Sequence, residues 1–388
     1  MTELKVATLE SLELKDLQDL MRSGGPCVTL LLPAYRPGAQ AKSMAAILKS
    51  SLQEAAAQLA ARKVPESEVK DLLAPLQELA REDELLAGSH WGRVIFRAPD
   101  VLQQFELFES VGQSLTVGGC FDIRAILNDL HRPAEFYILK LSKKNVALLR
   151  CAHLHAEPAA LPKGVPQTLE EVLEFEQPDH GLVNRSAAGP SVGTMGGVSF
   201  GTGSGRETQH TYLADFYKAV DRGIGQLLNG NKAPLVLAGV TEDVSSYRLI
   251  NTYKKLMETS IQGSAGDWIS NEDLLRQAHA IIQAHQTERA AAELVEYRER
   301  SSPARFSTDV DTILRAAADG RVHRLYIDKL ARRPGVFQGA KRGGRWDWGQ
   351  EDLLNIAAVE TVLQGGMPFA LPPDCMPDGA AAAAVFRY

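Results

Sequence analysis

The spacing of apolar residues predicts strands and amphipathic helices in the first part of the chain. Residues 27–32 form a mostly apolar run between turn-forming glycine and proline residues, which is typical of a short buried strand. Residues 92–96 predict a second strand. Between them, apolar side chains recur every three or four residues, as on one face of a helix. The two predicted helices carry Met44, Ile47, Leu48, Leu52 and Leu59, then Val69, Leu72, Leu73, Leu76 and Leu79.

The pattern changes after Arg132-Pro133. Residues 136–141 and 146–150 predict two strands joined by a hairpin. A long irregular stretch follows, from about residue 156 to residue 210, and we expect a helix to open near Thr211. The apolar run 234–238 predicts another buried strand.

From about His285 onward, helices and strands alternate, which predicts a small α/β sandwich. We expect helices at 288–300, from the Thr308 cap to Gly320, and at 351–363, with strands at 322–327, 367–371 and 384–388. The whole chain is therefore expected to be an α/β protein of three domains. Their boundaries are 1–131, 132–284 and 285–388.

Composition and charge narrow the class of protein. A chain of 388 residues fits two or three domains, and a net charge of −6 argues against a surface covered in positive charge, although a local basic patch is compatible with it. The N-terminal residues lack an apolar signal core, and no stretch approaches the ~20 apolar residues of a membrane span. The four cysteines lie far apart, as is typical of reduced thiols. We expect a cytoplasmic protein with no membrane association.

The common catalytic and metal-binding motifs are missing from the sequence. It contains no G-x-S-x-G, no P-loop, no H-E-x-x-H and no paired C-x-x-C. His153 and His155 share one face of a predicted strand and could chelate a metal, but no acidic or cysteine partner lies near them. We therefore expect neither a metal site nor a cofactor.

A glycine-rich loop, residues 189–210, interrupts the middle domain. Such a loop inside a compact domain is usually functional or disordered, because glycine gives the backbone many conformations. It could cradle phosphate, although no P-loop lysine follows, insert a mobile tip into a partner, or serve as a disordered linker. We expect residues 189–208 to be mobile. Its glycines are Gly189, Gly193, Gly196, Gly197, Gly201, Gly203 and Gly205.

A basic cluster occupies residues 321–350, which hold eight lysine or arginine residues against two aspartates. Glycines interrupt the cluster, and the aromatic residues Phe337, Trp346 and Trp348 lie in or beside it. This combination suits contact with RNA phosphates and bases, whereas the simpler alternative is a solvated loop. The predicted RNA-binding residues are Arg332, Arg333, Lys341, Arg342 and Arg345.

The order of these elements resembles the archaeo-eukaryotic translation release factors and their pelota-type rescue relatives, and more closely the bacterial families of that architecture. The resemblance covers all three segments, and residues 309–327, a helix, a glycine and a strand, match most specifically. It implies a release-factor-like N-terminal domain, an RNase H-like middle domain and a C-terminal domain similar to a kink-turn-binding ribosomal protein. An RNase H-like nuclease would need carboxylates on its central strands, and residues 136–150 contain none.

The hydrolytic Gly-Gly-Gln motif of that family is absent, because Gly196-Gly197 is followed by Val198. The nearest substitute is Gln209, which would place water at the peptidyl-tRNA ester, with Gly203 and Gly205 as a flexible approach. Alternatively, Gln209 caps or solvates the following helix. No counterpart of the stop-codon-reading residues is found.

Two functions follow from the resemblance. The first is a factor of translation termination or ribosome rescue that promotes peptidyl-tRNA hydrolysis. The alternative is a non-catalytic protein that binds RNA or the ribosome. The expected partners are the ribosome or its tRNA and rRNA, and a translational GTPase is a further candidate.

Overall fold

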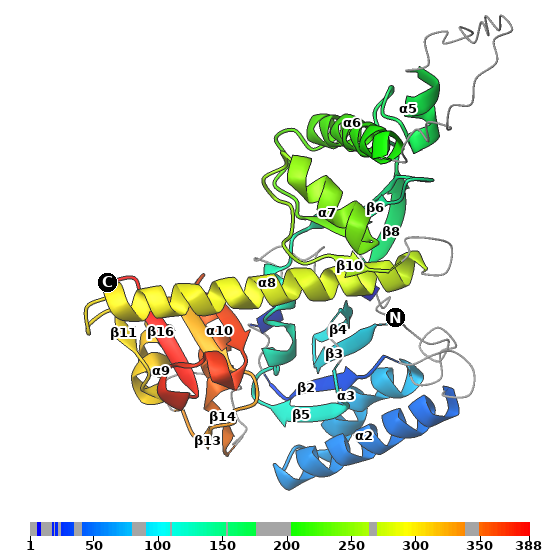
Figure 1. Cartoon of the computed structure of the whole chain (residues 1–388). Helices are drawn as coiled ribbons and strands as arrows, with labels where there is room; N and C mark the ends of the chain where they lie inside the picture. The colour runs from blue at the N-terminus through cyan, green and yellow to red at the C-terminus, as the bar shows by residue number, and fades with distance from the viewer. Residues whose placement is uncertain are drawn as a thin grey trace, which may run out of the picture. The chain divides into compact units, whose positions relative to one another are not determined.

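The computed structural model describes residues 6–8, 18, 20–21, 25–34, 41–79, 91–108, 111–152, 154–175, 203–263, 270–337 and 349–388. The chain is mixed α/β, as predicted, and it divides into two compact units (Figure 1). Unit 1 combines Met1–Arg132 with Gln283–Tyr388, and unit 2 is Pro133–Ile282. No helix in the described ranges is both long enough and apolar enough to cross a membrane.

The first sheet of unit 1 has five strands in the order β1-β4-β3-β2-β5. All neighbours pair antiparallel except β1 and β4, which are parallel. Two helices pack on the sheet through the apolar positions that their periodicity predicted. The strands are β1 (Val6–Thr8), β2 (Cys27–Leu32), β3 (Gly92–Ala98), β4 (Val101–Leu107) and β5 (Ser114–Gly118), and the helices are α2 (Ala41–Ala61) and α3 (Glu66–Leu79).

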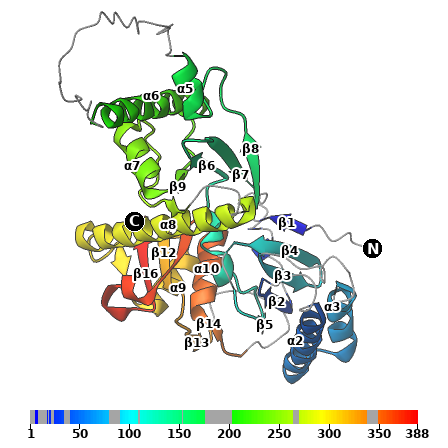
Figure 2. The same ribbon diagram turned by 45° about the vertical axis from the view of Figure 1, so that its right-hand side comes forward.

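The second sheet of unit 1 has the order β11-β16-β12-β15. Leu325 and Ile327 on β12 pack with residues of α9 and α10, whereas Tyr326 packs with residues of α8, because side chains alternate along a strand. Figure 2 shows these three helices beside the sheet. The strands are β11 (Phe306–Ser307), β12 (Val322–Asp328), β15 (Met367–Leu371) and β16 (Ala382–Phe386), and the helices are α8 (Asn271–Arg300), α9 (Val310–Ala318) and α10 (Leu353–Leu363).

The two sheets of unit 1 share one hydrophobic core. Phe96, Phe121 and Ile126 from the first segment belong to the same buried cluster as Leu354 and Val359 of α10. Each of the three larger sheets lies within one predicted domain range, but the first and third ranges form a single unit. The division into three domains therefore stays a prediction.

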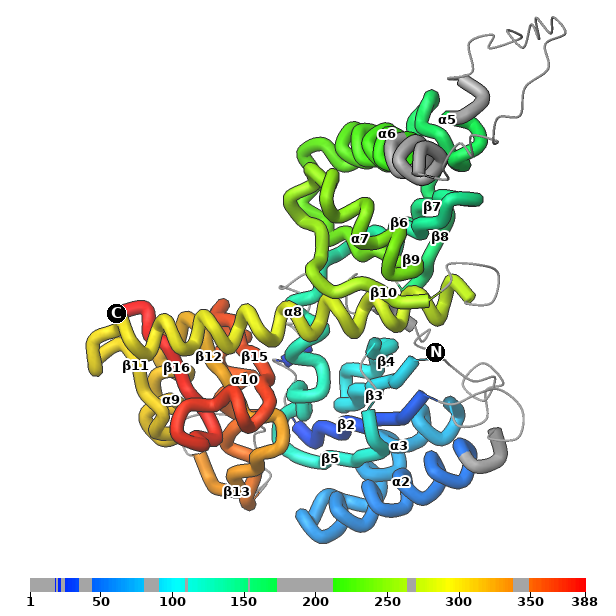
Figure 3. The backbone as a smooth tube through the Cα atoms, viewed as in Figure 1, coloured from blue at the N-terminus to red at the C-terminus, as the bar shows by residue number. Residues whose placement is uncertain are grey.

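Unit 2 contains a mixed five-stranded sheet in the order β10-β9-β6-β7-β8. The hairpin of β6 and β7 is confirmed, and β6, β9 and β10 are parallel. Helices α6 and α7 pack together over the sheet (Figure 3). The elements are β6 (Glu135–Leu141), β7 (Ala147–Ala152), β8 (His155–Ala159), α5 (Leu169–Phe175), α6 (Gly203–Leu227), β9 (Leu235–Gly239), α7 (Thr241–Ile250) and β10 (Ile261–Gln262).

Several predicted boundaries were wrong. The N-cap of α9 is Asp309, whose carboxylate accepts the backbone N–H of Thr312 at 2.8 Å, and not Thr308. Helix α6 begins at Gly203 and not near Thr211, so its first eight residues are helical although they lack an apolar periodicity. Helix α8 runs without interruption from Asn271 to Arg300 through the position where a new helix was expected at 288, because no glycine or proline occurs within it. The stretch from residue 156 is not wholly irregular, since it contains most of β8 and all of α5.

Candidate functional site

Residues 329–333 follow β12 and include Lys329, Arg332 and Arg333; we call this segment the basic turn. It is held by hydrogen bonds to the backbone and side chain of Asp328. Its carboxylate accepts the backbone N–H groups of Leu330 at 2.8 Å and Ala331 at 3.3 Å, and its carbonyl oxygen also accepts from Ala331. An aspartate that bonds to the backbone two residues ahead is a common way to fix a tight turn. This turn sets the direction in which Arg332 and Arg333 leave the sheet.

Asp352 ties the end of this turn to α10. Its Oδ1 accepts the backbone N–H of Arg333 at 3.1 Å and that of Leu354 at 3.2 Å, so one carboxylate both fixes the turn and caps the helix. The short strands β13 (Pro334–Gly335) and β14 (Glu351–Asp352) pair antiparallel next to the basic turn.

Arg124 joins the first segment of unit 1 to this turn. Its guanidinium lies 2.8 Å from Asp352 Oδ2 and 3.4 Å from Asp122 Oδ1, and it donates to the carbonyl oxygen of Ala331 at 2.9 Å. Only 7% of the Arg124 side chain is exposed. The Arg124 charge is therefore paired with Asp122 and Asp352. We infer that this side chain holds the basic turn in position.

Arg332 and Arg333 are the exposed cations of this site. The Arg332 side chain is 59% exposed, and its Nε lies 3.9 Å from Asp352 Oδ2, which is too long for a hydrogen bond. Partial burial and then the nearby charge of Arg124 lower the pKa of Arg332. Arginine nevertheless keeps its proton throughout the physiological range. Both side chains can therefore contact phosphate oxygens.

A groove of about 350 Å³ opens beside this turn. Arg124, Lys329 and Arg332 contribute its positive charge and Asp122 its negative charge, while Leu31, Val111, Ala125 and Leu330 line its apolar part. Exposed cations beside a groove suit a ligand that carries phosphate groups. The groove is therefore our candidate functional site.

The structure brings only part of the predicted RNA-binding set into view. Arg332 and Arg333 are adjacent and exposed, whereas Lys341, Arg342 and Arg345 lie outside the described residues. Sequence reasoning missed Arg124, because it comes from a different segment and no local pattern marks it. Its partner Asp352 lies more than 200 residues further along the chain, so no sequence signal could have found this contact.

The predicted catalytic residues Gly203, Gly205 and Gln209 all lie within α6. The prediction that these glycines belong to a flexible loop was wrong, since they form the first turns of a helix. Gln209 is the seventh residue of that helix, so it does not cap it. The rest of the glycine-rich loop, residues 189–202, lies outside the described residues. The catalytic assignment itself stays a prediction.

A buried polar network anchors the other end of α6. Asp221 accepts hydrogen bonds from the Tyr247 hydroxyl at 3.2 Å and from the Thr252 hydroxyl at 2.6 Å. Burial, followed by the negative charge of Asp221, raises the pKa of Tyr247, so this hydroxyl stays protonated and acts as a donor. The network connects α6, the helix that contains Gln209, to α7.

No metal centre is evident in the parts of the chain that the structure describes. They contain no group of three or more histidine, cysteine, aspartate or glutamate side chains placed to hold a metal ion. His155 opens β8 with an exposed side chain, and its predicted partner His153 lies outside the described residues.

Comparison with known proteins finds one family model that matches the middle of the chain. Residues 135–321 match the model described as bacterial archaeo-eukaryotic release factor family 3. No curated protein sequence matches the chain.

Similar solved structures include an archaeal translation termination factor, aRF1, at 13% identity and a TM-score of 0.25, covering 99% of each chain. Pelota of Archaeoglobus fulgidus is 11% identical over 77% of this chain and 80% of its own, with a TM-score of 0.35. Dom34 of S. cerevisiae, described as a translation termination-like factor, is 10% identical over 77% of this chain and 81% of its own, with a TM-score of 0.33.

Proposed function

We propose that this chain, whose residues 135–321 match a bacterial family of archaeo-eukaryotic release factors, acts on the ribosome in translation termination or ribosome rescue. The family match carries the proposal, because it covers almost all of unit 2 and, in unit 1, the second part of α8 and all of α9. The protein would work in the cytoplasm, and a translational GTPase is its candidate protein partner.

The exposed basic turn supports contact with tRNA or rRNA. Arg332 and Arg333 leave the fold beside the groove, and a bidentate guanidinium is well suited to phosphate oxygens. Lys341, Arg342 and Arg345 follow in the sequence and would extend the same positive surface. RNA affinity would then come from the local charge of this turn, despite the net charge of −6 of the whole chain.

Ribosome binding is tested by sedimentation of the full chain with ribosomes over a range of salt concentrations. The double variant Arg332→Glu/Arg333→Glu should weaken binding and reduce the slope of log affinity against log salt by ~0.7–0.9 for each phosphate that the variant no longer neutralises. The control is Arg298→Glu/Arg300→Glu, which makes the same change of charge on α8, where these exposed arginines pair with Asp378 and Glu296. Equal sedimentation of the two variants would refute the role of the turn.

Peptidyl-tRNA hydrolysis is the finer version of the proposal. It requires a polar group that orients water at the ester, and Gln209, with Gly203 and Gly205 before it, is the candidate. The assay is peptide release from purified peptidyl-tRNA–ribosome complexes with the wild type and with Gln209→Ala. Release by the wild type that disappears in the variant supports hydrolysis through Gln209.

A specific observation favours the alternative, a non-catalytic ribosome- or RNA-binding protein. The sequence contains no Gly-Gly-Gln, and its nearest substitute, Gln209, lies on a helix rather than in a glycine loop. Ribosome binding without peptide release from any stalled complex would support this alternative.

A further inference from the structure

A second cavity of unit 1, of about 340 Å³, lies among α8, β12, β15 and the short helix η3 (Asp129–His131). It shares no lining residue with the groove beside Arg332. Three arginines line it: Arg132, Arg289 and Arg324. One carboxylate, Glu293, lines it with them.

The positive charge of this cavity is only loosely compensated. Arg324 Nη1 lies 3.5 Å from Glu293 Oε2, and Arg289 Nη2 lies 3.9 Å from Glu293 Oε1. Both distances exceed the ~2.7–2.9 Å of a charge-assisted hydrogen bond. A single carboxylate thus faces two guanidinium groups, and Asp129 lies 3.7 Å from the third, that of Arg132. Among the described residues, Arg289 and Arg324 therefore share one carboxylate, that of Glu293, which leaves this pair of arginines with a surplus positive charge.

Arg324 still has hydrogen-bonding capacity to offer. Its Nε is buried and finds no acceptor among the described residues, which is costly for a charged donor. The Arg289 side chain is 68% exposed, so it can reorient toward a ligand. One of the two arginines is thus fixed and the other is adjustable.

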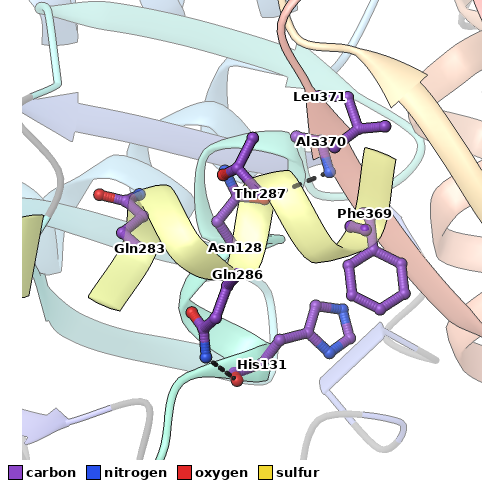
Figure 4. A pocket seen from close by; sticks show the side chains of 9 residues that line it. Asn128, His131, Gln283, Gln286, Thr287, Phe369, Ala370 and Leu371 are labelled. Carbon is purple, nitrogen blue, oxygen red and sulfur yellow. Dashed lines mark hydrogen bonds between the residues drawn. The ribbon is translucent and has the colours of Figure 1, made fainter. Parts of the chain in front are cut away.

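An aromatic stack fixes Arg324 and limits the kind of ligand. The Phe369 ring stacks on the rings of His131 and Tyr326, with centroid distances of 3.9 Å and 5.6 Å. The Arg324 guanidinium carbon lies 5.4 Å from the centroid of the Phe369 ring. His131 Nε2 lies 2.6 Å from the carbonyl oxygen of Pro368, and Gln286 donates to the carbonyl oxygen of His131 (Figure 4). Because Phe369 already stacks with two rings, the cavity does not suit a nucleobase that needs a stacking surface.

We propose that this cavity binds a phosphate group, held by Arg324 and Arg289. Two guanidinium groups that converge from a strand and a helix match the oxygens of a phosphate dianion, and the surplus positive charge favours it over a neutral ligand. Glu293 competes with the phosphate for both arginines. The phosphate is either part of an RNA backbone or carried by a small phosphorylated molecule.

Titration of the full chain with inorganic phosphate at constant ionic strength, followed by ³¹P NMR, tests the site. Arg324→Gln should weaken binding about tenfold or more, since it removes a charge-assisted contact. Glu293→Gln should strengthen binding, because it removes the competing carboxylate. Arg298→Gln, on the same helix but outside the cavity, is the matched control and should bind as the wild type does.

Glu293→Gln keeps the test informative even if Arg324→Gln does not fold, because only a binding role predicts a gain in affinity. No phosphate binding by the wild type, or unchanged affinity in Glu293→Gln, overturns the proposal. A short RNA that displaces phosphate from the wild type identifies the backbone as the source. Phosphate binding that RNA does not displace identifies a small phosphorylated molecule. Neither result depends on ribosome binding.

Discussion

Replacing Arg124 with methionine should lower the free energy of unfolding of unit 1 by about 2–4 kcal/mol. At an effective dielectric constant of ~20, two unit charges 2.8 Å apart attract by about 6 kcal/mol, and desolvation offsets much of this. Methionine would leave the Asp352 carboxylate, which is only 19% exposed, without its nearest cation. It would also leave the carbonyl oxygen of Ala331 without this donor. Arg332, 3.9 Å from Asp352, would compensate only in part.

Urea denaturation measures the loss of unfolding free energy. A double-mutant cycle with Asp352→Asn isolates the contribution of the ion pair, because asparagine can still cap α10. Arg298→Met is the control: its pair with Asp378 is short, at 2.6 Å, but the two side chains are 46% and 77% exposed. That control should cost less than about 1 kcal/mol. If Arg124→Met costs no more than Arg298→Met, burial does not strengthen the Arg124 contacts and the reasoning fails.

Three further predictions concern single side chains. Burial lowers the pKa of His131 below its ordinary 6.5, so the folded state disfavours protonation of this side chain. The free energy of unfolding should therefore be highest above about pH 6.5 and decrease as the pH falls. His131→Gln should reduce this decrease, as urea denaturation at pH 7.5 and at pH 5 would show. Burial raises the pKa of the Cys151 thiol to about 12, so at pH 8 a thiol reagent should label the partly exposed Cys375 before Cys151, as mass spectrometry of the native protein would show. Gly239→Ala should lower the free energy of unfolding of unit 2 by about 1–3 kcal/mol, as thermal denaturation would show, because the new Cβ would lie 2.8 Å from the carbonyl oxygen of Leu141.

Buried strands were the easiest elements to predict from the sequence. The apolar runs at 27–32, 92–96, 136–141 and 234–238 correspond to β2, β3, β6 and β9. Each is short, bounded by turn residues, and buried along most of its length, so local pattern and tertiary environment agree. The helix faces of α2 and α3 were predictable for the same reason.

The misplaced helix boundaries have a different cause. The first turns of α6 are polar and contain two glycines, so no apolar face marks them, and glycine argues locally against a helix. The domain boundary expected near His285 led to a predicted helix start at 288, but α8 contains no glycine or proline and runs unbroken from Asn271 to Arg300. Helix ends depend on capping and tertiary contacts more than on periodicity.

The shared core of unit 1 could not be predicted, because it depends on contacts between segments far apart in the sequence. Asn355 on α10 accepts the backbone N–H of Ile123 at 3.0 Å and donates to the carbonyl oxygen of Phe121 at 2.9 Å. A buried asparagine inside an apolar helix is a visible anomaly, since buried polar groups need partners, but the sequence does not say where those partners lie.

The family match ends at Arg321, immediately before β12, and therefore does not include the basic turn. Two separate lines thus support ribosome binding: the family match, which covers unit 2 and α8, and the exposed charge of Arg332 and Arg333. Because Arg332 lies in unit 1 and Gln209 in unit 2, the two variants can fail independently. Loss of binding in the Arg332 variant with release intact in Gln209→Ala would assign the protein to RNA contact through unit 1. The opposite result would place its essential chemistry on α6.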